Sequence, residues 1–436
     1  MARKQPERGF EFTQDMIDQS ENIPAILREF RSKSWQAYQE QSFPTSKDEA
    51  WRRTSLSGLD FAGLQLPNGK PLGDVPDISG KILTDDVIGK NSKAILSPTG
   101  VEIKISAKSK KAGLIIESLL VAAEKFPDLV SKVLGKVISP SDGKFAAAAA
   151  AFAKHGLFVY VPKGVQLEDP IFSLSFASWQ KTAHFYQVLV YLEEGSSLSY
   201  IHESLSPEGN SDPSLAAENI EIFVGKNANL KFVELQSYGD QVWSFGHHKA
   251  IVEQDGNLEW GIGALGSSLT KQFISVDLVG RGAEGRVAGL FFGDQNQHLT
   301  YNTLQRHLAP WTTSDLLFKG ALNGKSRSVW RGMIYVAPGA KHIDGYQANR
   351  NLVLDQNARS DSIPGLEILN NDVRCTHGST VGKIDQEQLF YLLSRGISRE
   401  DAEQLIIQGF FDEVFSRYKV PEIKDQLWQL IQTKLQ

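Results

Sequence analysis

The feature that most constrains the fold is a short sequence pattern, typical of a turn followed by a strand, that recurs through the middle of the chain. Between residues 156 and 375, short runs of β-branched and aromatic residues are separated by Gly, Asn and Asp turns. The apolar position of the pattern recurs at steps of 31, 32, 28 and 29 residues, at Leu167, Leu198, Leu230, Leu258 and, more loosely, Val287. A recurrence near thirty, without helical periods between the strands, predicts stacked all-β coils that bury their faces on one another. A β-sandwich of evenly spaced strands is the structural alternative.

Helical patterns flank this β region. Residues 23–39 place apolar side chains at mostly helical spacings, 114–125 predict a second helix, and 145–152 predict a buried helix of six alanines between two phenylalanines. We therefore expect three parts: an N-terminal helical and mixed region (1–145), a β core (146–384) and a C-terminal helical region (385–436).

The C-terminal helices carry more apolar surface than about fifty residues can bury among themselves. The first of these helices has a predicted apolar face of Leu389, Phe390, Leu392 and Leu393. The predicted apolar face of the second consists of Ala402, Leu405, Ile406, Phe410 and Val414. This surface has to meet either the β core or a partner.

Composition excludes several classes of protein. The chain is 41% hydrophobic and 22% charged, which indicates a core-forming globular protein, and its net charge of -5 with dispersed Lys and Arg disfavours nucleic-acid or acidic-membrane partners. No apolar run approaches the ~18 residues that cross a bilayer, and the charged start has no apolar stretch typical of a secretory signal. A single cysteine excludes an internal disulfide framework. We expect a cytoplasmic protein.

That cysteine, Cys375, lies two residues before His377 in the densest run of unusual residues in the chain, 372–382. In a strand, residues i and i+2 face the same side, so the thiol and the imidazole would converge. Both are ligands for iron, zinc or copper, but structural metal sites use four donors. Either residues of neighbouring coils or a second subunit would complete the set, unless Cys375 is merely a buried thiol.

Other chemistry is less well supported. A Cys–His nucleophile and base is disfavoured, because no cysteine-protease signature surrounds Cys375. The run 320–326 resembles a phosphate-binding loop but has three residues between its glycines where four are needed, and a strand-like segment follows, so a β-turn is predicted. His247 and His248 would point to opposite faces of a strand and cannot easily bind one ion; with His202, they are expected to be ordinary histidines.

The run from Cys375 to Gly382, followed by Asp385, 389–392 and 394–397, resembles the C-terminal signature of the SufB/SufD iron–sulfur assembly proteins. Supporting matches are 159–165, 349–352 and Pro364 with 366–368, and the stretch 44–54 is similar to the SufD branch. The resemblance covers about residues 145–415. It implies a right-handed parallel β-helix between two helical regions, in agreement with the repeat.

The resemblance also implies a non-enzymatic scaffold subunit for de novo iron–sulfur cluster assembly. Such a subunit pairs with a SufB-like paralogue through the β-helix and binds a SufC-like ATPase through its C-terminal helices. His377, with Cys375 as a second contact, would hold a nascent, transient cluster at the subunit interface. The expected ATPase-binding residues are Leu389, Phe390, Leu392, Ser394, Arg395, Gly396, Ile406 and Phe410. A homodimer in the absence of SufB and a flavin on the complex are left open. A polysaccharide-active β-helix enzyme and a standalone metal-binding protein are the alternatives.

Overall fold

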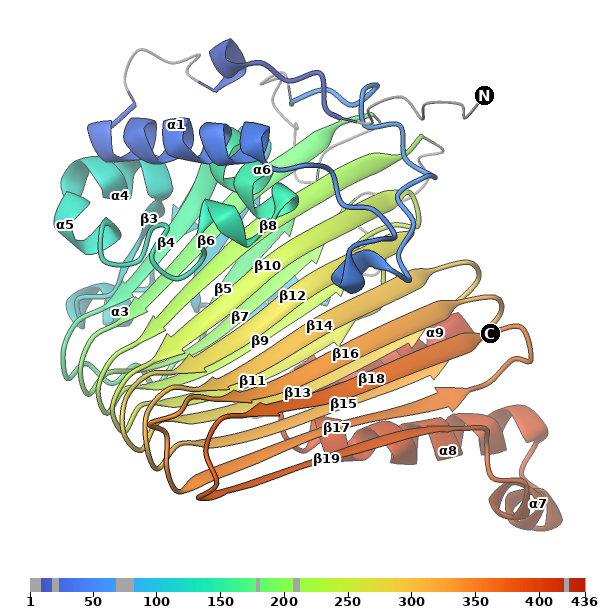
Figure 1. Ribbon diagram of the computed structural model, residues 1–436. Helices are drawn as coiled ribbons and strands as arrows, with labels where there is room; N and C mark the ends of the chain where they lie inside the picture. Colours follow the sequence, from blue (N-terminus) through green and yellow to red (C-terminus); the bar gives the residue numbers. More distant parts are fainter. Residues whose placement is uncertain are drawn as a thin grey trace.

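The chain folds into a β-solenoid of about eight turns with helices at both of its long faces (Figure 1). The structure is a computed structural model, and it describes residues 9–17, 23–67, 82–177, 181–206, 212–418 and 423–435. Each turn contributes one strand to each of two sheets, so odd-numbered strands from β5 onward lie in one sheet and even-numbered strands from β4 onward in the other. The prediction of stacked β coils is confirmed, and the sandwich alternative is wrong.

The ten-stranded sheet has the order β19-β17-β15-β13-β11-β9-β7-β5-β1-β2. In that order the strands are Val373–Gly382, Ile343–Val353, Thr313–Leu322, Glu284–Gly293, Asn257–Ala264, Asn229–Ser237, Ser197–Leu205, Ile171–Phe176, Ser92–Ser97 and Gly100–Lys104. The nine-stranded sheet has the order β18-β16-β14-β12-β10-β8-β6-β4-β3. Its strands are Arg359–Ile368, Arg327–Val336, His298–His307, Leu269–Leu278, Val242–Val252, Ser214–Val224, Ala183–Leu192, His155–Val161 and Ile115–Ser118.

The strand register explains the recurrence in the sequence. Leu198, Leu230 and Leu258 occupy one row across β7, β9 and β11, and Gln166 bridges to Ser197 one residue before Leu167. The prediction that Val287 is the fifth position of this row was wrong. Val287 lies opposite Trp260, two residues further along the strand, and Gly285 stands in the leucine row.

The space between the two sheets is the main core. Its largest side chains include Tyr200, Phe232 and Trp260, which lie on successive coils and pack in a tilted arrangement, with ring centroids 5.2 and 5.8 Å apart. Fully burying one such side chain stabilises the fold by about 1.5–3 kcal/mol. Because each ring packs on the next coil, the coils stabilise one another in series.

Helices of the N-terminal region cover the outer face of the nine-stranded sheet. The predicted alanine-rich helix is α6 (Lys144–Phe152), whose alanines are buried between α1 (Ala25–Glu40) and the strands β6, β8 and β10. Alanine allows this close approach because its side chain ends at Cβ. The short helices α3 (Ala107–Lys111) and α5 (Pro127–Val130) belong to the same region, whereas α2 (Asp85–Ile88) shares a hydrophobic cluster with Phe172 and Phe176 of the ten-stranded sheet.

The predicted helix at 114–125 begins later than expected. Ile115–Ser118 form β3, which pairs antiparallel with β4, and only Leu119–Lys125 form a helix, α4. The side chain of Ser118 accepts a hydrogen bond from the backbone N–H of Val121, which caps the helix at this point. Pairing with the edge of the sheet outweighs helix propensity in the first four residues.

The C-terminal helices divide between two roles. α8 (Arg399–Phe415) and α9 (Lys424–Leu435) lie on the outer face of the ten-stranded sheet, whereas α7 (Gln386–Ser394) projects beyond it (Figure 1). The buried face of α8 is Ala402, Ile407, Phe411, Val414 and Phe415. The predicted face shared only Ala402 and Val414 with it, because the helix turns toward the sheet by about one residue more than the pattern suggested. No helix of the described residues is long and apolar enough to cross a membrane.

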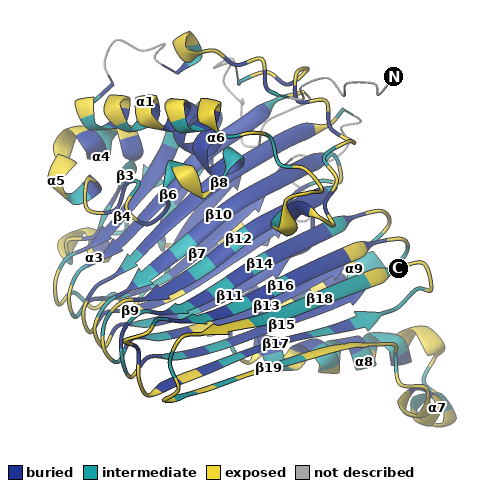
Figure 2. Cartoon of the chain, viewed as in Figure 1, coloured by how far each residue is buried: buried dark blue, intermediate teal, exposed yellow. Residues whose placement is uncertain are grey.

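The two ends of the solenoid differ in the elements that cover them. The first end carries the antiparallel strands β2 and β3, and helices pack beside it. The last strands, β18 and β19, are the outermost strands of their sheets and are mostly half-buried or exposed (Figure 2). The last coil therefore offers two unpaired strand edges.

Candidate functional site in the last coil

Cys375 and His377 lie on β19, the last strand of the ten-stranded sheet. Cys375 is opposite Gly345 of β17, and His377 is opposite Gln347. Cys375 packs against a cluster that includes Ile334 and Val336, which fill the inside of the last turns. The predicted shared face is therefore the inner face of the solenoid. The thiol is half-buried, and His377 is exposed at the open end.

The rows that lead to these two residues change character along the solenoid. The leucine row described above continues from Leu258 through Gly285, Ser314 and Gly345 to Cys375. The aromatic row continues from Trp260 through Val287, Leu316 and Gln347 to His377. Positions that build an apolar core in the first coils thus hold small or polar groups, a thiol and an imidazole in the last ones.

A second histidine, His307 of β14, lies beside Cys375. A methyl group on Gly345 would be 3.2 Å from Cys375 Sγ and 3.3 Å from His307 Nε2, so thiol and imidazole flank the same small gap. His307 Nδ1 is 2.7 Å from Thr312 Oγ1, and its Nε2 is 2.9 Å from Ser314 Oγ. Sequence reasoning missed this residue, because only the strand register brings it to Cys375.

Burial keeps both groups of this pair neutral. It raises the pKa of the Cys375 thiol, and the charge of Asp344 raises it further, against a smaller opposing effect of the Gly345 backbone. Burial also lowers the pKa of His307 to about 4. A thiolate at Cys375 therefore requires a positive partner, such as a metal ion.

The Cys375 and His377 side chains are of types that suit a soft or borderline metal, but they supply only two donors. A thiolate and an imidazole are accepted ligands of iron, and four donors are the usual number around iron in a cluster. Among the described residues, no group of three or more His, Cys, Asp and Glu side chains is placed to hold a metal ion.

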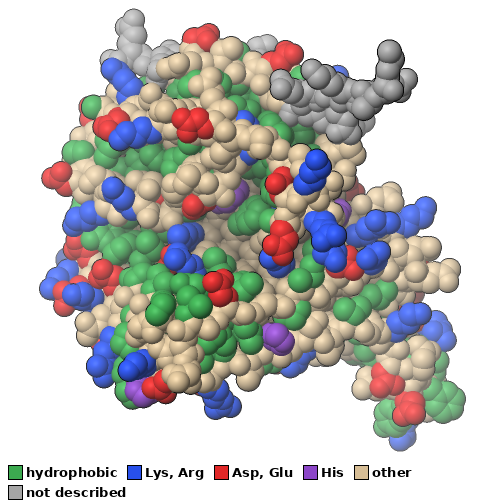
Figure 3. Space-filling view, viewed as in Figure 1, with side chains coloured by type: hydrophobic (Ala, Val, Ile, Leu, Met, Phe, Trp, Pro, Cys, Tyr) green, Lys and Arg blue, Asp and Glu red, His purple; other side chains and the backbone are tan. Residues whose placement is uncertain are grey.

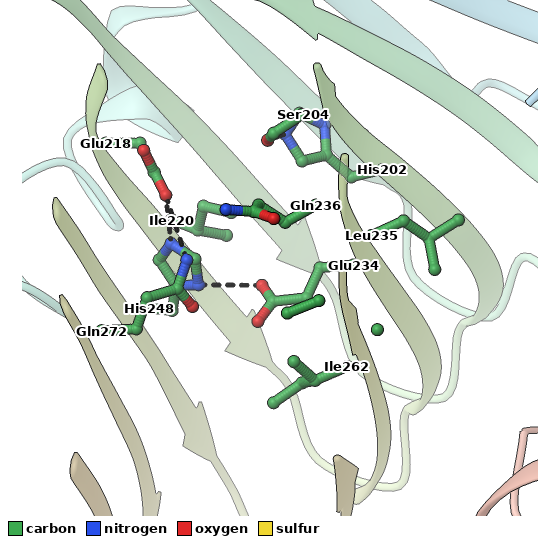
Figure 4. A pocket seen from close by; sticks show the side chains of 12 residues that line it. His202, Ser204, Glu218, Ile220, Glu234, Leu235, Gln236, His248, Ile262 and Gln272 are labelled. Atoms are coloured by element: carbon green, nitrogen blue, oxygen red, sulfur yellow. Dashed lines mark hydrogen bonds and ion pairs between the residues drawn. The ribbon is translucent and has the colours of Figure 1, made fainter. Parts of the chain in front are cut away.

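A separate charged cluster is buried inside the middle coils (Figure 4). His248 lies between two glutamates, with Nε2 3.3 Å from Glu218 Oε1 and Nδ1 2.8 Å from Glu234 Oε2. Burial alone would lower the pKa of His248, but the two carboxylates outweigh burial and raise it to about 10. Because the two ring nitrogens face opposite carboxylates, the cluster holds an imidazolium ion, and His248 is not the ordinary histidine that the sequence suggested.

The remaining sequence motifs are placed as expected. His247 and His248 do face opposite sides of β10, and His202 is an inner-face histidine whose Nδ1 is 2.6 Å from Ser173 Oγ. The loop-like run 320–326 ends β15 and turns directly into β16, with Gly324 at a φ of 59°. A phosphate-binding loop needs a helix at this point, so the β-turn prediction is confirmed.

The residues expected to bind a partner are spread over different faces. Leu389 is buried, so it does not share one stripe with Phe390, which is 72% exposed. Leu392, Ile406 and Phe410 are half-buried. Ser394, Arg395 and Gly396 are exposed at the end of α7. The exposed aromatic side chain next to Phe390 is Tyr391, and the guanidinium of Arg395 lies 5.2 Å from its ring centroid.

Comparisons with known proteins agree with this architecture. A family model described as "SUF system FeS cluster assembly, SufBD core domain" matches residues 175–410, and one described as "SufBD protein N-terminal region" matches residues 92–172. Iron-sulfur cluster assembly SufBD family proteins of Staphylococcus epidermidis, Staphylococcus aureus and Staphylococcus haemolyticus are each 30% identical to this chain over 327 residues. The aligned region is 75% of this chain and 70% of each relative.

Proposed function

Because this chain belongs to the SufBD family of iron–sulfur cluster assembly proteins, we propose that it is the SufD-type scaffold subunit of a Suf complex. In this role it would supply one side of a shared site on which a cluster is built and then passed on. The observation that carries the proposal is the position of Cys375 and His377 on the inner face of the outermost strand, at the open end of the solenoid.

The shared site follows from the donor set. His377 is exposed and is the residue that can reach a group held by a neighbouring chain, whereas Cys375 is half-buried and its thiol is protonated until a metal approaches. We assign His377 as the main ligand or proton-handling group and Cys375 as a second contact. The cluster is the product under assembly and is held transiently at the interface, with its other ligands from the partner.

The open edges of β18 and β19 support a β-solenoid as that partner. Unpaired edge strands accept backbone hydrogen bonds from another edge of the same geometry. A SufB-like paralogue with the same coil dimensions would extend both sheets across the interface. A second copy of this chain would fit the same edges when SufB is absent.

The projecting helix α7 supports a separate dock for a SufC-like ATPase. Phe390 and Tyr391 are exposed, although large apolar side chains at such positions are usually covered. Leu405, at 48% exposure on α8, extends the same apolar character. ATP hydrolysis would belong to that partner, since the run 320–326 forms a turn between strands. Such a complex would work in the cytoplasm.

The test is His377→Ala in the full complex with the SufB-like and SufC-like partners. We expect iron and acid-labile sulfide in the purified complex to fall at least tenfold, while the three subunits still co-elute. The matched control is Thr376→Ala, because Thr376 is the exposed neighbour on the outward face of the same strand. A wild-type cluster yield in the His377 variant would refute the assigned role.

Cys375→Ser separates the contributions of the two side chains. If Cys375 is a second contact, its replacement lowers cluster yield less than His377→Ala does. Equal loss in both variants would make the thiol an essential ligand. Stoichiometric iron on the isolated wild-type chain would contradict the shared site, because all donors would then lie in this chain.

A further inference from the structure

A cavity of about 440 Å³ opens on the outer face of the nine-stranded sheet. Its floor is formed by β10, β12, β14 and β16, and Ile138 and Asp142 of the segment before α6 form its roof. Figure 3 shows this face hollowed below the N-terminal helices, with cationic and hydrophobic side chains around the hollow. Cavities of this size commonly hold small organic ligands.

The floor is apolar and partly flat. Phe273, Leu304 and Met333 line it, and the ring of His247 stacks on Phe273 with centroids 4.8 Å apart and planes 16° from parallel. His247 is buried, and neither of its ring nitrogens has a hydrogen-bond partner. Burial lowers the pKa of His247 to about 3, so the ring is neutral. A buried imidazole without partners is costly unless a ligand supplies one.

Cations outnumber carboxylates around the cavity. Lys249, Arg306 and Arg331 line it, against the single lining carboxylate of Asp142. Lys249 and Arg306 both form ion pairs with the carboxylate of Asp277, at 3.1 and 2.9 Å. These three side chains therefore carry a net charge of one positive unit. Arg331 pairs at 2.6 Å with Glu49, which is highly exposed. Because Glu49 is highly exposed, this pair is weak and easily exchanged for a ligand anion.

The roof is fixed in place over this floor. The buried carboxyl group of Glu221 on β8 accepts hydrogen bonds from the backbone N–H groups of Gly135, Val137 and Ile138 at 3.0–3.2 Å. On the floor, the buried Lys271 donates to Oδ1 of Asn302 at 2.9 Å, which leaves the amide NH2 of Asn302 to donate to a ligand. Buried polar contacts therefore anchor both the loop above the cavity and a strand of its floor.

We propose that this cavity binds a small aromatic anion, an organic carboxylate, sulfonate or phosphate whose ring lies on the His247–Phe273 wall. Its acidic group would be held by Arg331, with the Lys249–Arg306 pair and Asn302 nearby. The proposal does not depend on the role of Cys375 and His377, because no residue of that site lines the cavity.

The test uses 1-anilinonaphthalene-8-sulfonate, an aromatic sulfonate that fluoresces in apolar sites, with the full-length chain. We expect one saturable site on the wild type, and at least tenfold weaker binding to Arg331→Ala. Met333→Trp, which fills the cavity without removing charge, should weaken binding to a similar degree. Arg286→Ala is the matched control, because Arg286 is also an ion-paired strand arginine but lies in the other sheet.

Two outcomes overturn the proposal. Unchanged affinity in both Arg331→Ala and Met333→Trp, with unfolding curves like the wild type, places the probe elsewhere. N-phenyl-1-naphthylamine has the same rings without the sulfonate. If the wild type binds it as tightly as 1-anilinonaphthalene-8-sulfonate, the cavity does not recognise an anion and the proposal is wrong. Should one variant unfold, the other still decides, since one alters charge and the other alters volume.

Discussion

The first and last coils of the solenoid share one backbone plan but bury different side chains. In the first coils, inner positions are aliphatic or aromatic, helices cover the nine-stranded sheet, and antiparallel strands close the end. In the last coils, the same rows reach Gln347, Cys375 and His377, and the final strands are open. The first end is therefore covered and closed, whereas the last end leaves polar side chains and two strand edges open.

The same contrast separates the C-terminal helices. Phe411 of α8 is fully buried on the sheet, whereas Phe390 of α7 is 72% exposed. Phe411→Ala should lower the free energy of unfolding by about 3–5 kcal/mol. Phe390→Ala should leave it within about 0.5 kcal/mol of the wild type but weaken ATPase binding at least tenfold.

Urea unfolding and a binding titration of the two variants measure these effects. If Phe390→Ala binds the ATPase as tightly as the wild type does, α7 is not the ATPase-binding surface. Truncation before Asp385 is a poorer test, because it also uncovers the apolar sheet face beneath α8 and α9.

A matched pair of leucines tests the two ends directly. Leu258 and Leu366 both face inward, but Leu258 is fully buried in a covered coil and Leu366 is 37% exposed in the last one. We expect Leu258→Ala to cost about 2–5 kcal/mol and Leu366→Ala less than about 1 kcal/mol. Chemical denaturation gives both values. Equal losses would mean that the last coil is as firmly packed as the others, and that the two ends do not differ in stability.

Buried charge in the covered region predicts lower stability at alkaline pH. The folded-state pKa of His248 is raised to about 10 by Glu234 and Glu218 against the effect of burial, and burial raises the pKa of Glu221 to about 8. Both groups bind protons more tightly when folded, so their contribution is complete below their ordinary pKa values and is lost as pH rises through the raised ones.

Unfolding free energies measured from pH 5 to pH 10 should therefore decrease, by at most about 1.4 kcal/mol per pH unit and per group. Glu221→Gln keeps an acceptor for the loop and should flatten the curve between pH 4.5 and 8. An unchanged slope in that variant would show that Glu221 does not titrate in this range.

The smallest effect is expected at the gap beside Cys375. A methyl group at Gly345 would lie within 3.4 Å of Cys375, His307 and Ile334, whereas one at Gly378 of the next strand would meet only Tyr346 Oη at 3.8 Å. Gly345→Ala should cost about 1 kcal/mol and slow the reaction of the single thiol with a disulfide reagent severalfold. Gly378→Ala is the control. The same thiol reactivity in both variants would argue that the gap does not govern access to Cys375.

Some errors of sequence reasoning have a common physical cause. The pattern placed Leu405 and Phe410 on the buried face of α8, yet Ile407 and Phe411 face the sheet. It also extended a helix over Ile115–Ser118, where a free sheet edge recruited a strand. In each case the neighbouring element, which lies far away in sequence, decided which alternative was chosen.

The sequence by itself determined the coil repeat, the buried alanine helix and the shared face of Cys375 and His377, because these depend on spacings within one strand or helix. Only the tertiary structure brought His307 to Cys375, placed Glu218 and Glu234 around His248, and separated the covered α8 from the exposed α7. Those contacts join residues from different coils. Their register is set by the number of residues in each coil, which ranges from 26 between Trp243 and Leu269 to 32 between Ala183 and Leu215. One residue more or less in any coil would therefore have paired other side chains.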